Sequence, residues 1–189
     1  MRPQKINDHQ LFASLLTTFR NKGYDGASLN DLAAGAGLKK ASLYHRFPGG
    51  KEEIARKVLE NARSWGGKNI AAILQDKTLP ANQRLEAGLK SIDDFYKGGK
   101  ESCLLRALSM ENGLQLFQDE IARSMQAWID AFSQLGEDLG FSPEVAVQKA
   151  RQTLILIQGS LVVAKGLQQP DVFTNALQQI RQSFTLKSK

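Results

Sequence analysis

The chain has 189 residues, of which 25 are lysine or arginine and 19 are aspartate or glutamate, giving a formal net charge of +6. This length is enough for one or two compact units with a sizeable core, and the single cysteine, Cys103, excludes an internal disulfide framework. The apolar run 153–164 is too short to span a membrane and the first ten residues are polar, so we expect no membrane contact, no signal peptide and a cytoplasmic location.

Most of the positive charge lies at the N-terminal end of the chain. Residues 1–51 hold eight basic and three acidic side chains, a net charge of +5, which leaves about +1 for the remainder. A basic unit beside a nearly neutral one is typical of a polyanion-binding unit joined to a second function. The alternative is that the excess charge only aids solubility.

Three short helices are predicted first along the chain. Leucine and phenylalanine residues at helical spacing predict a helix over 7–22 that ends at a glycine. Ser28 is placed to cap a second helix, because its hydroxyl can accept a hydrogen bond from an unpaired backbone N–H. Gly37 stands where the chain must turn sharply, and Leu38 is expected to anchor that turn in the core. A third helix over 39–46 follows, and the pattern as a whole indicates a helix-turn-helix.

Particular residues in this segment match a known family. They are Phe19-Arg20-Asn21-Lys22-Gly23-Tyr24, Ser28, Leu32-Ala33, Ala36-Gly37, Leu43-Tyr44-His45-Arg46-Phe47 and Lys51-Glu52-Glu53. On these residues the first third of the chain resembles the DNA-binding domain of the TetR (tetracycline-repressor) family of bacterial transcription regulators. The Pro48-Gly49-Gly50 turn is one residue longer than the commoner family spacing and resembles a multidrug-type branch that carries FPGGK. Lys39 stands where a serine is more usual.

The resemblance implies that the third helix enters the major groove of operator DNA. It places Tyr44 and Lys51 at phosphates and Lys40 and His45 near base edges, while Ser28 can cap its helix and also donate to a phosphate. The predicted DNA-binding residues are Ser28, Lys39, Lys40, Ala41, Ser42, Tyr44, His45 and Lys51. The alternative is a solvated basic helix face, and most protein–DNA hydrogen bonds go to the DNA backbone in any case.

The rest of the chain also has helical spacing, with no alternating strand pattern. A linker helix begins near residue 51, and further helices are predicted around 85–96, 103–110, 117–139, 144–165 and 171–184. The predicted fold is therefore all-α, with an N-terminal three-helix helix-turn-helix domain over 1–51. Residues 52–189 are predicted to form a helical bundle for effector binding and dimerisation.

Aromatic and methionine residues in the second part are candidates for the wall of an effector cavity. The predicted effector-binding residues are Trp65, Phe95, Met110, Phe117, Met125, Trp128, Phe132 and Gln158. Pockets combine apolar walls with few polar groups, and Gln158 on an otherwise apolar helix suits the polar role. The alternatives are that the aromatic residues fill the core and that Gln158 is a satisfied buried amide or an interface hydrogen bond.

The last two predicted helices carry more apolar surface than one small domain can hide, which predicts a homodimer interface. The predicted interface residues are Leu154, Ile157, Leu161, Phe173, Leu177 and Ile180.

Catalytic and metal-binding patterns do not appear in the sequence. The only histidines are His9 and His45, and neither has a partner at metal-ligand spacing, so no enzyme activity, metal or cofactor is predicted. Cys103 lies beside two leucines, which favours a buried inert thiol over a redox sensor.

The sequence therefore predicts a homodimeric, ligand-responsive transcription regulator. As the resemblance implies, it would be a repressor released from a palindromic operator by a small, mostly apolar or aromatic effector, although activation stays open. The alternatives are a regulator without a small-molecule effector and a helical binding or interaction module.

Overall fold

The computed structural model describes residues 6–185, and every regular element within this range is helical, which confirms the all-α fold. The chain forms two compact units. One contains the described residues up to Ala62 together with Leu104–Ile121, and the other contains Arg63–Cys103 together with the described residues from Ala122 onward. Residue 51, where we expect the first domain to end and a linker helix to begin, lies in the first turn of α4 (Gly50–Gly66), whose residues up to Ala62 belong to the first unit.

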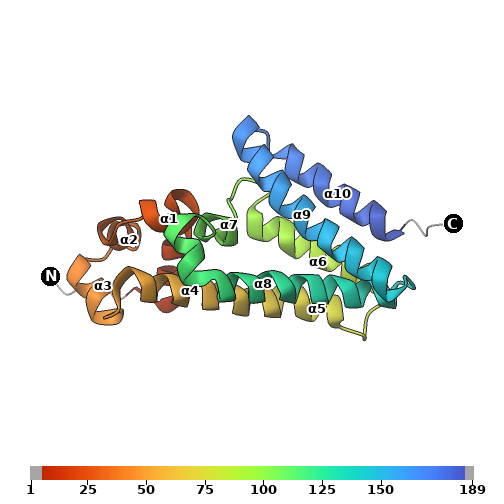
Figure 1. The fold of residues 1–189 in the computed structure, drawn as a ribbon, viewed down its shortest axis with the longest axis horizontal. Helices are drawn as coiled ribbons and strands as arrows, with labels where there is room; N and C mark the ends of the chain where they lie inside the picture. The colour runs from red at the N-terminus through yellow and green to blue at the C-terminus, as the bar shows by residue number, and fades with distance from the viewer. Residues whose placement is uncertain (1–5, 186–189) are drawn as a thin grey trace. The chain divides into compact units, whose positions relative to one another are not determined.

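The first unit is built from short helices and parts of two longer ones. They are α1 (Asp8–Gly26), α2 (Leu29–Gly35), α3 (Lys40–Arg46), most of α4 (Gly50–Gly66), α7 (Leu104–Leu108) and the beginning of α8 (Glu111–Asp138) (Figure 1). The sequence predicts that the first helix ends at Gly23. Instead α1 continues to Gly26, and Gly23, where φ is 70°, forms a kink within it. The segment around Gly23 packs against α7, since an added Cβ there would lie 3.2 Å from the carbonyl oxygen of Ala107.

The core of the first unit joins α1 to α8. Leu11, Leu15 and Phe19 on α1 are fully buried. The rings of Tyr24 and Phe117 meet edge to face with centroids 5.0 Å apart, so a residue of α8 closes the core at the end of α1.

The second unit is a helical bundle. It contains the end of α4, a π-helical turn η1 (Gly67–Ala71), α5 (Ala72–Gln75), α6 (Ala81–Tyr96), the rest of α8, α9 (Pro143–Leu167) and α10 (Asp171–Thr185). Within this unit α10 packs along α9 and also contacts α6 (Figure 1). The predicted start of α9 is confirmed, because the Ser142 hydroxyl accepts a hydrogen bond from the Val145 N–H and Pro143 occupies the first turn.

Two glycines in the second unit allow close contacts between elements. Gly99 has φ of +86°, and a Cβ added there would lie 2.6 Å from the Cβ of Phe173. Gly66 stands immediately before the π-helical turn, and a Cβ there would lie 3.3 Å from Trp128 Nε1. The helix therefore changes from α to π geometry at glycines 66–67, and the missing side chain of Gly66 leaves room for the Trp128 ring.

A nearly buried arginine ties three elements of the second unit together. Arg84 on α6, with 5% of its side chain exposed, donates from Nη1 to the Leu74 carbonyl oxygen and to Asp138 Oδ2, both at 2.8 Å. The hydrogen bond from Arg84 holds the pKa of the Asp138 carboxyl below its ordinary value of 3.8, and the charge of Lys77 adds to this effect. The ion pair fixes α5 and α6 against the end of α8.

Candidate nucleic-acid interface

The start of α2 is held by a reciprocal cap. The Asp31 N–H donates to Ser28 Oγ at 3.1 Å, and the Ser28 N–H donates to Asp31 Oδ2 at 2.9 Å. Lys22 on α1 donates to the same carboxylate, and this bond, followed by those from Ser28, lowers the pKa of Asp31. The predicted capping role of Ser28 is confirmed, and the cap fixes α2 to α1.

The turn between α2 and α3 has the geometry expected for a helix-turn-helix. Gly37 has φ of +65°, and the Leu38 N–H donates to the Ala33 carbonyl oxygen at 2.8 Å. Leu38 itself is half-buried, so it anchors the turn less deeply than the sequence suggests. A Cβ on Gly35 would lie 2.6 Å from Thr18 Oγ1, so this glycine, with Ala33, permits the close approach of α1 and α2.

Helix α3 has one anchoring residue and a polar outer surface. Leu43 is fully buried and fixes the helix to the unit, while Ser42 is half-buried. The exposed residues at the start and along the outside of this helix are Lys39, Lys40, Ala41, Tyr44, His45 and Arg46. The Lys40 ammonium lies 6.0 Å from the centre of the Tyr44 ring, so a cation and an aromatic hydroxyl share one surface.

Lys51 lies at the start of α4 and is bound to α1. Its ammonium donates to the Tyr24 carbonyl oxygen at 3.0 Å and lies 4.3 Å from the centre of the Tyr24 ring. The structure therefore gives Lys51 an internal partner, whereas the predicted lysines of α3 point to solvent. A contact between Lys51 and a phosphate would require it to share or leave that partner.

Arg46 was not among the predicted contacts. It is exposed at the end of α3 and donates to Asp8 Oδ1 at 2.9 Å. Arg46 and Lys39 are seven residues apart, which places them on one side of a helix, so helical spacing was a signal that could have found Arg46.

The predicted effector residues are distributed over both units. Trp65 and Phe95 stack with centroids 4.3 Å apart, and Trp128 approaches Gly66 beside them. Trp65, Phe95, Met125 and Trp128 are half-buried residues of the second unit. The Oε1 atom of Gln158 is buried and has no hydrogen-bond partner within the described range 6–185.

Three other predicted effector residues have surroundings that differ from those of the half-buried aromatic residues. Phe117 belongs to the core of the first unit, and Phe132 is fully buried with its ring 6.1 Å from that of Phe184. Both are already surrounded by packed side chains, so their environment is that of core residues. Met110 belongs to the first unit and is largely exposed.

The predicted dimer residues require a correction. Ile157, Leu161, Phe173, Leu177 and Ile180 are buried within a single protomer, and Leu154 is half-buried. The physical reason is that α9 and α10 turn these side chains toward each other and toward the rest of the second unit. The apolar residues that α9 leaves exposed are Ile155, Val162, Val163 and Leu167.

No group of three or more histidine, cysteine, aspartate or glutamate side chains within 6–185 is arranged to hold a metal ion. None of the helices in this range is both long and apolar enough to cross a membrane. Cys103 is buried, with its sulfur 3.5 Å from the Tyr96 hydroxyl.

The helix-turn-helix segment and the longer chain are both similar to known regulators. Residues 13–58 match the family model described as "Bacterial regulatory proteins, tetR family". The HTH-type transcriptional regulator LmrA of Bacillus subtilis is 23% identical over 159 residues, covering 82% of this chain and 84% of LmrA. The biofilm operon icaADBC HTH-type negative transcriptional regulator IcaR of Staphylococcus aureus (strain Newman) is 43% identical over 117 residues, covering 62% of this chain and 60% of IcaR.

Solved structures match nearly the whole chain. A TetR transcriptional regulator from Legionella pneumophila superposes with a TM-score of 0.81 at 20% identity, covering 97% of this chain and 100% of that one. The regulator CifR, as a cysteine mutant complexed with 26-bp double-strand operator DNA, gives a TM-score of 0.76 at 19% identity and covers 100% of both chains. These likenesses establish that both units have the fold found in such regulators.

Proposed function

We propose that this chain is a transcription regulator of the TetR family, which its family-model match, relatives and fold support, and that it acts as a repressor by binding operator DNA. The observation that carries the proposal is the outer surface of α3. Lys39, Lys40, Tyr44 and His45 are exposed on a helix that Leu43 anchors and that follows a capped α2. A rigid helix presenting cations, a hydroxyl and an imidazole suits the major groove, which offers acceptors on bases and phosphates on both sides.

The proposed active form is a homodimer on a palindromic operator. Two copies related by a twofold axis place two α3 helices in successive major grooves, one helical turn apart. A single short helix reaches only a few base pairs, so the dimer supplies both affinity and specificity.

We assign the dimer contact to the outer face of α9. Ile155, at 69% exposure, and Val162, at 50%, lie seven residues apart on this face. Gly159 and Gly166, also seven residues apart, have open space where a Cβ would stand, so another helix can approach the backbone closely. An exposed apolar strip with small residues is unfavourable in water and fits a second copy of the same helix.

The proposed effector is a small aromatic molecule bound beside Trp65, Phe95, Trp128 and Met125. Half-buried aromatic side chains offer flat surfaces, and methionine adapts its shape to the ligand. Such a ligand weakens DNA binding only in proportion to its preference for the conformation that does not fit DNA. The Pro48-Gly49-Gly50 turn supports assignment to the multidrug-type branch.

An electrophoretic mobility shift with the DNA flanking the chain's own gene, at fixed salt, tests the proposal. We expect a shifted complex that the double change Lys39→Ala and Lys40→Ala abolishes. Lys90→Ala is the matched control, because this lysine is exposed on α6 of the second unit.

Three outcomes separate the alternatives. No shift with that DNA or with sequences selected from random DNA contradicts operator binding and favours an interaction module. A shift that a broad panel of aromatic molecules fails to reverse, with no change in tryptophan emission, favours a regulator without such an effector. Higher transcription from the shifted promoter in a reconstituted assay contradicts repression.

A further inference from the structure

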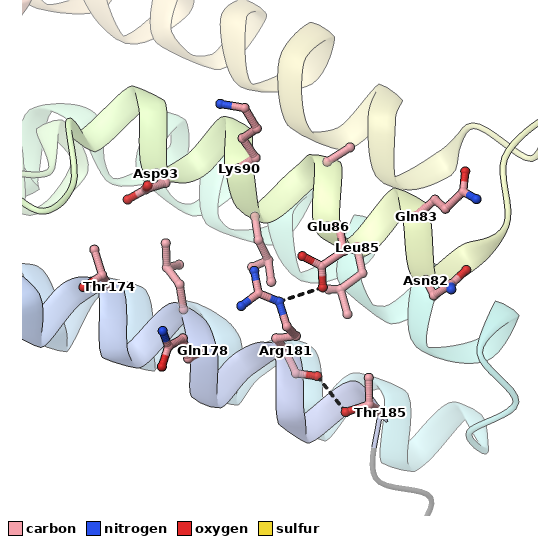
Figure 2. A pocket seen from close by; sticks show the side chains of 13 residues that line it. Asn82, Gln83, Leu85, Glu86, Lys90, Asp93, Thr174, Gln178, Arg181 and Thr185 are labelled. Atoms are coloured by element: carbon pink, nitrogen blue, oxygen red, sulfur yellow. Dashed lines mark hydrogen bonds and ion pairs between the residues drawn. The ribbon is translucent and has the colours of Figure 1, made fainter.

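A groove of about 830 Å³ lies between α6 and α10 within the second unit, outside the predicted effector residues (Figure 2). Its apolar lining includes Leu85, Leu89 and Leu177, which are almost completely buried. Polar and charged side chains from both helices surround these leucines. The groove therefore offers an apolar surface between charged groups, which is the arrangement that an amphiphilic ligand needs.

One carboxylate oxygen in the groove has no hydrogen-bond partner among residues 6–185. Asp93 Oδ1 is buried and accepts no hydrogen bond from the part of the chain that the structure describes. The hydroxyl of Thr174, which faces Asp93 from α10 in Figure 2, donates to the Asp171 carbonyl oxygen at 3.0 Å. Lys90, one turn away, is bound to Asp94 Oδ2 at 2.9 Å. A buried carboxylate oxygen without a donor is costly, so a ligand N–H that reached it would be bound favourably.

A second carboxylate lies on the same helix. Glu86 is seven residues before Asp93, which is two turns or about 10.5 Å along α6, on the same side. Glu86 Oε1 accepts from Arg181 Nε at 2.6 Å across the groove (Figure 2), with the two side chains 51% and 42% exposed. Ion pairs this exposed contribute little to stability, so Arg181 can release Glu86 at small cost.

We propose that this groove binds a linear organic dication of the alkyl diamine class. One ammonium group is bound by Asp93 and the other by Glu86, and the methylene chain lies on Leu85 and Leu89. One ammonium group supplies the N–H donor that Asp93 Oδ1 lacks, the other takes the place of Arg181 at Glu86, and a methylene chain matches the leucines between them. An anion is the poorer occupant, because it would be repelled by the Asp93 carboxylate, whose Oδ1 accepts no hydrogen bond from residues 6–185.

Isothermal titration calorimetry of the whole protein with 1,8-diaminooctane tests this site without DNA, so its result is independent of operator binding. The extended diamine has about the span between the two carboxylates, and octylamine, with one ammonium group, should bind at least about tenfold more weakly. Asp93→Asn should weaken diamine binding at least about tenfold, since a charge-assisted hydrogen bond is lost. Asp130→Asn is the matched control, because it removes the same charge from an exposed side chain of α8 outside the groove lining, and it should leave the affinity unchanged.

Arg181→Gln gives a test of opposite sign. It frees Glu86 and removes a positive charge, so diamine binding should become stronger. Weaker binding in this variant, equal losses in Asp93→Asn and Asp130→Asn, or no heat of binding in the unaltered protein would each overturn the proposal. If Asp93→Asn does not fold, Glu86→Gln replaces it, and unchanged diamine affinity in that variant also overturns the proposal.

Discussion

The lysines of the proposed DNA interface differ in how available their ammonium groups are for binding. Lys40 is exposed and lies near the Tyr44 ring, while Lys51 is bound to the Tyr24 carbonyl oxygen. Two lysines that resemble DNA-binding positions thus have different structural roles, because one already stabilises the fold.

Lys40→Ala should weaken operator binding without changing thermal stability. Its exposed ammonium on the proposed DNA-binding surface neutralises negative charge of the DNA, so its loss removes one released counterion and the slope of log affinity against log salt should fall by about one unit. The measurement is a binding titration at several salt concentrations. Lys90→Ala should leave the slope unchanged, and an unchanged slope in both variants would mean that Lys40 neutralises no charge of the DNA.

Asp138→Asn should lower the free energy of unfolding by about 2 kcal/mol, because it leaves Arg84 buried without its charged partner. The pH dependence has a definite sign. Because the pKa of Asp138 is lowered in the folded state, its stabilisation is complete above the ordinary pKa of 3.8 and is lost as the pH falls below it. Chemical unfolding at neutral pH and at about pH 3 should show the difference between the proteins shrinking with acid. An equal difference at both pH values contradicts this role.

The capping and turn residues were predictable from sequence, whereas the partners of charged residues were not. Ser28 and Gly37 act through bonds to residues a few positions away, and a local pattern contains that information. The partner of Lys51 is 27 residues distant, and that of Arg46 is 38 residues distant. Such pairs depend on how α1 packs against the later helices, which single-residue chemistry does not specify.

At the scale of an element, the local sequence pattern of α9 predicts where the helix begins but not what each of its faces contacts. Its start at Ser142 was predictable because cap, proline and acidic residue stand in order. Its two faces are both apolar, one with Ile157 and Leu161 and the other with Ile155 and Val162. Spacing identifies such a helix as buried all round, but it does not say which face meets the same chain and which is left for another.

Two neighbouring substitutions on α9 should have different consequences. Val162→Glu places a charge on the exposed face, so it should yield folded monomers at micromolar concentration. Leu161→Glu places the charge in the protomer core, where only 2% of the residue is exposed, so it should unfold the protein. Analytical ultracentrifugation and circular dichroism distinguish the two results. A monomeric unaltered protein, or a dimeric Val162→Glu variant, would exclude this face as the contact.

At the scale of the whole molecule, the chain passes between its two units three times, after Ala62, after Cys103 and after Ile121. The sequence places the helix-turn-helix correctly as an N-terminal segment, since its signals are local. It does not reveal that α7 and the start of α8 complete that unit, because their contacts with α1 join residues about 80 to 90 positions apart.

A fragment ending at residue 66 should therefore fold poorly. It lacks α7 and Phe117, so the surfaces around Gly23 and Tyr24 are left without their packing partners. Circular dichroism during heating should show a broad, weak transition in the fragment and a cooperative one in the full chain. A cooperative transition in the fragment would mean that α7 and α8 are dispensable for this unit.

The first unit is built from two separate segments of the chain, and this limits which segments can be exchanged between proteins of this fold by recombination. A crossover at one junction after the helix-turn-helix would bring in a new DNA-reading surface but keep the old α7 and Phe117, which would then face a foreign α1. A compatible exchange must transfer two separate stretches of gene together, or adjust the residues that contact Gly23 and Tyr24. New operator preferences are therefore expected to arise more readily by point changes on the exposed side of α3, which leave that shared core intact.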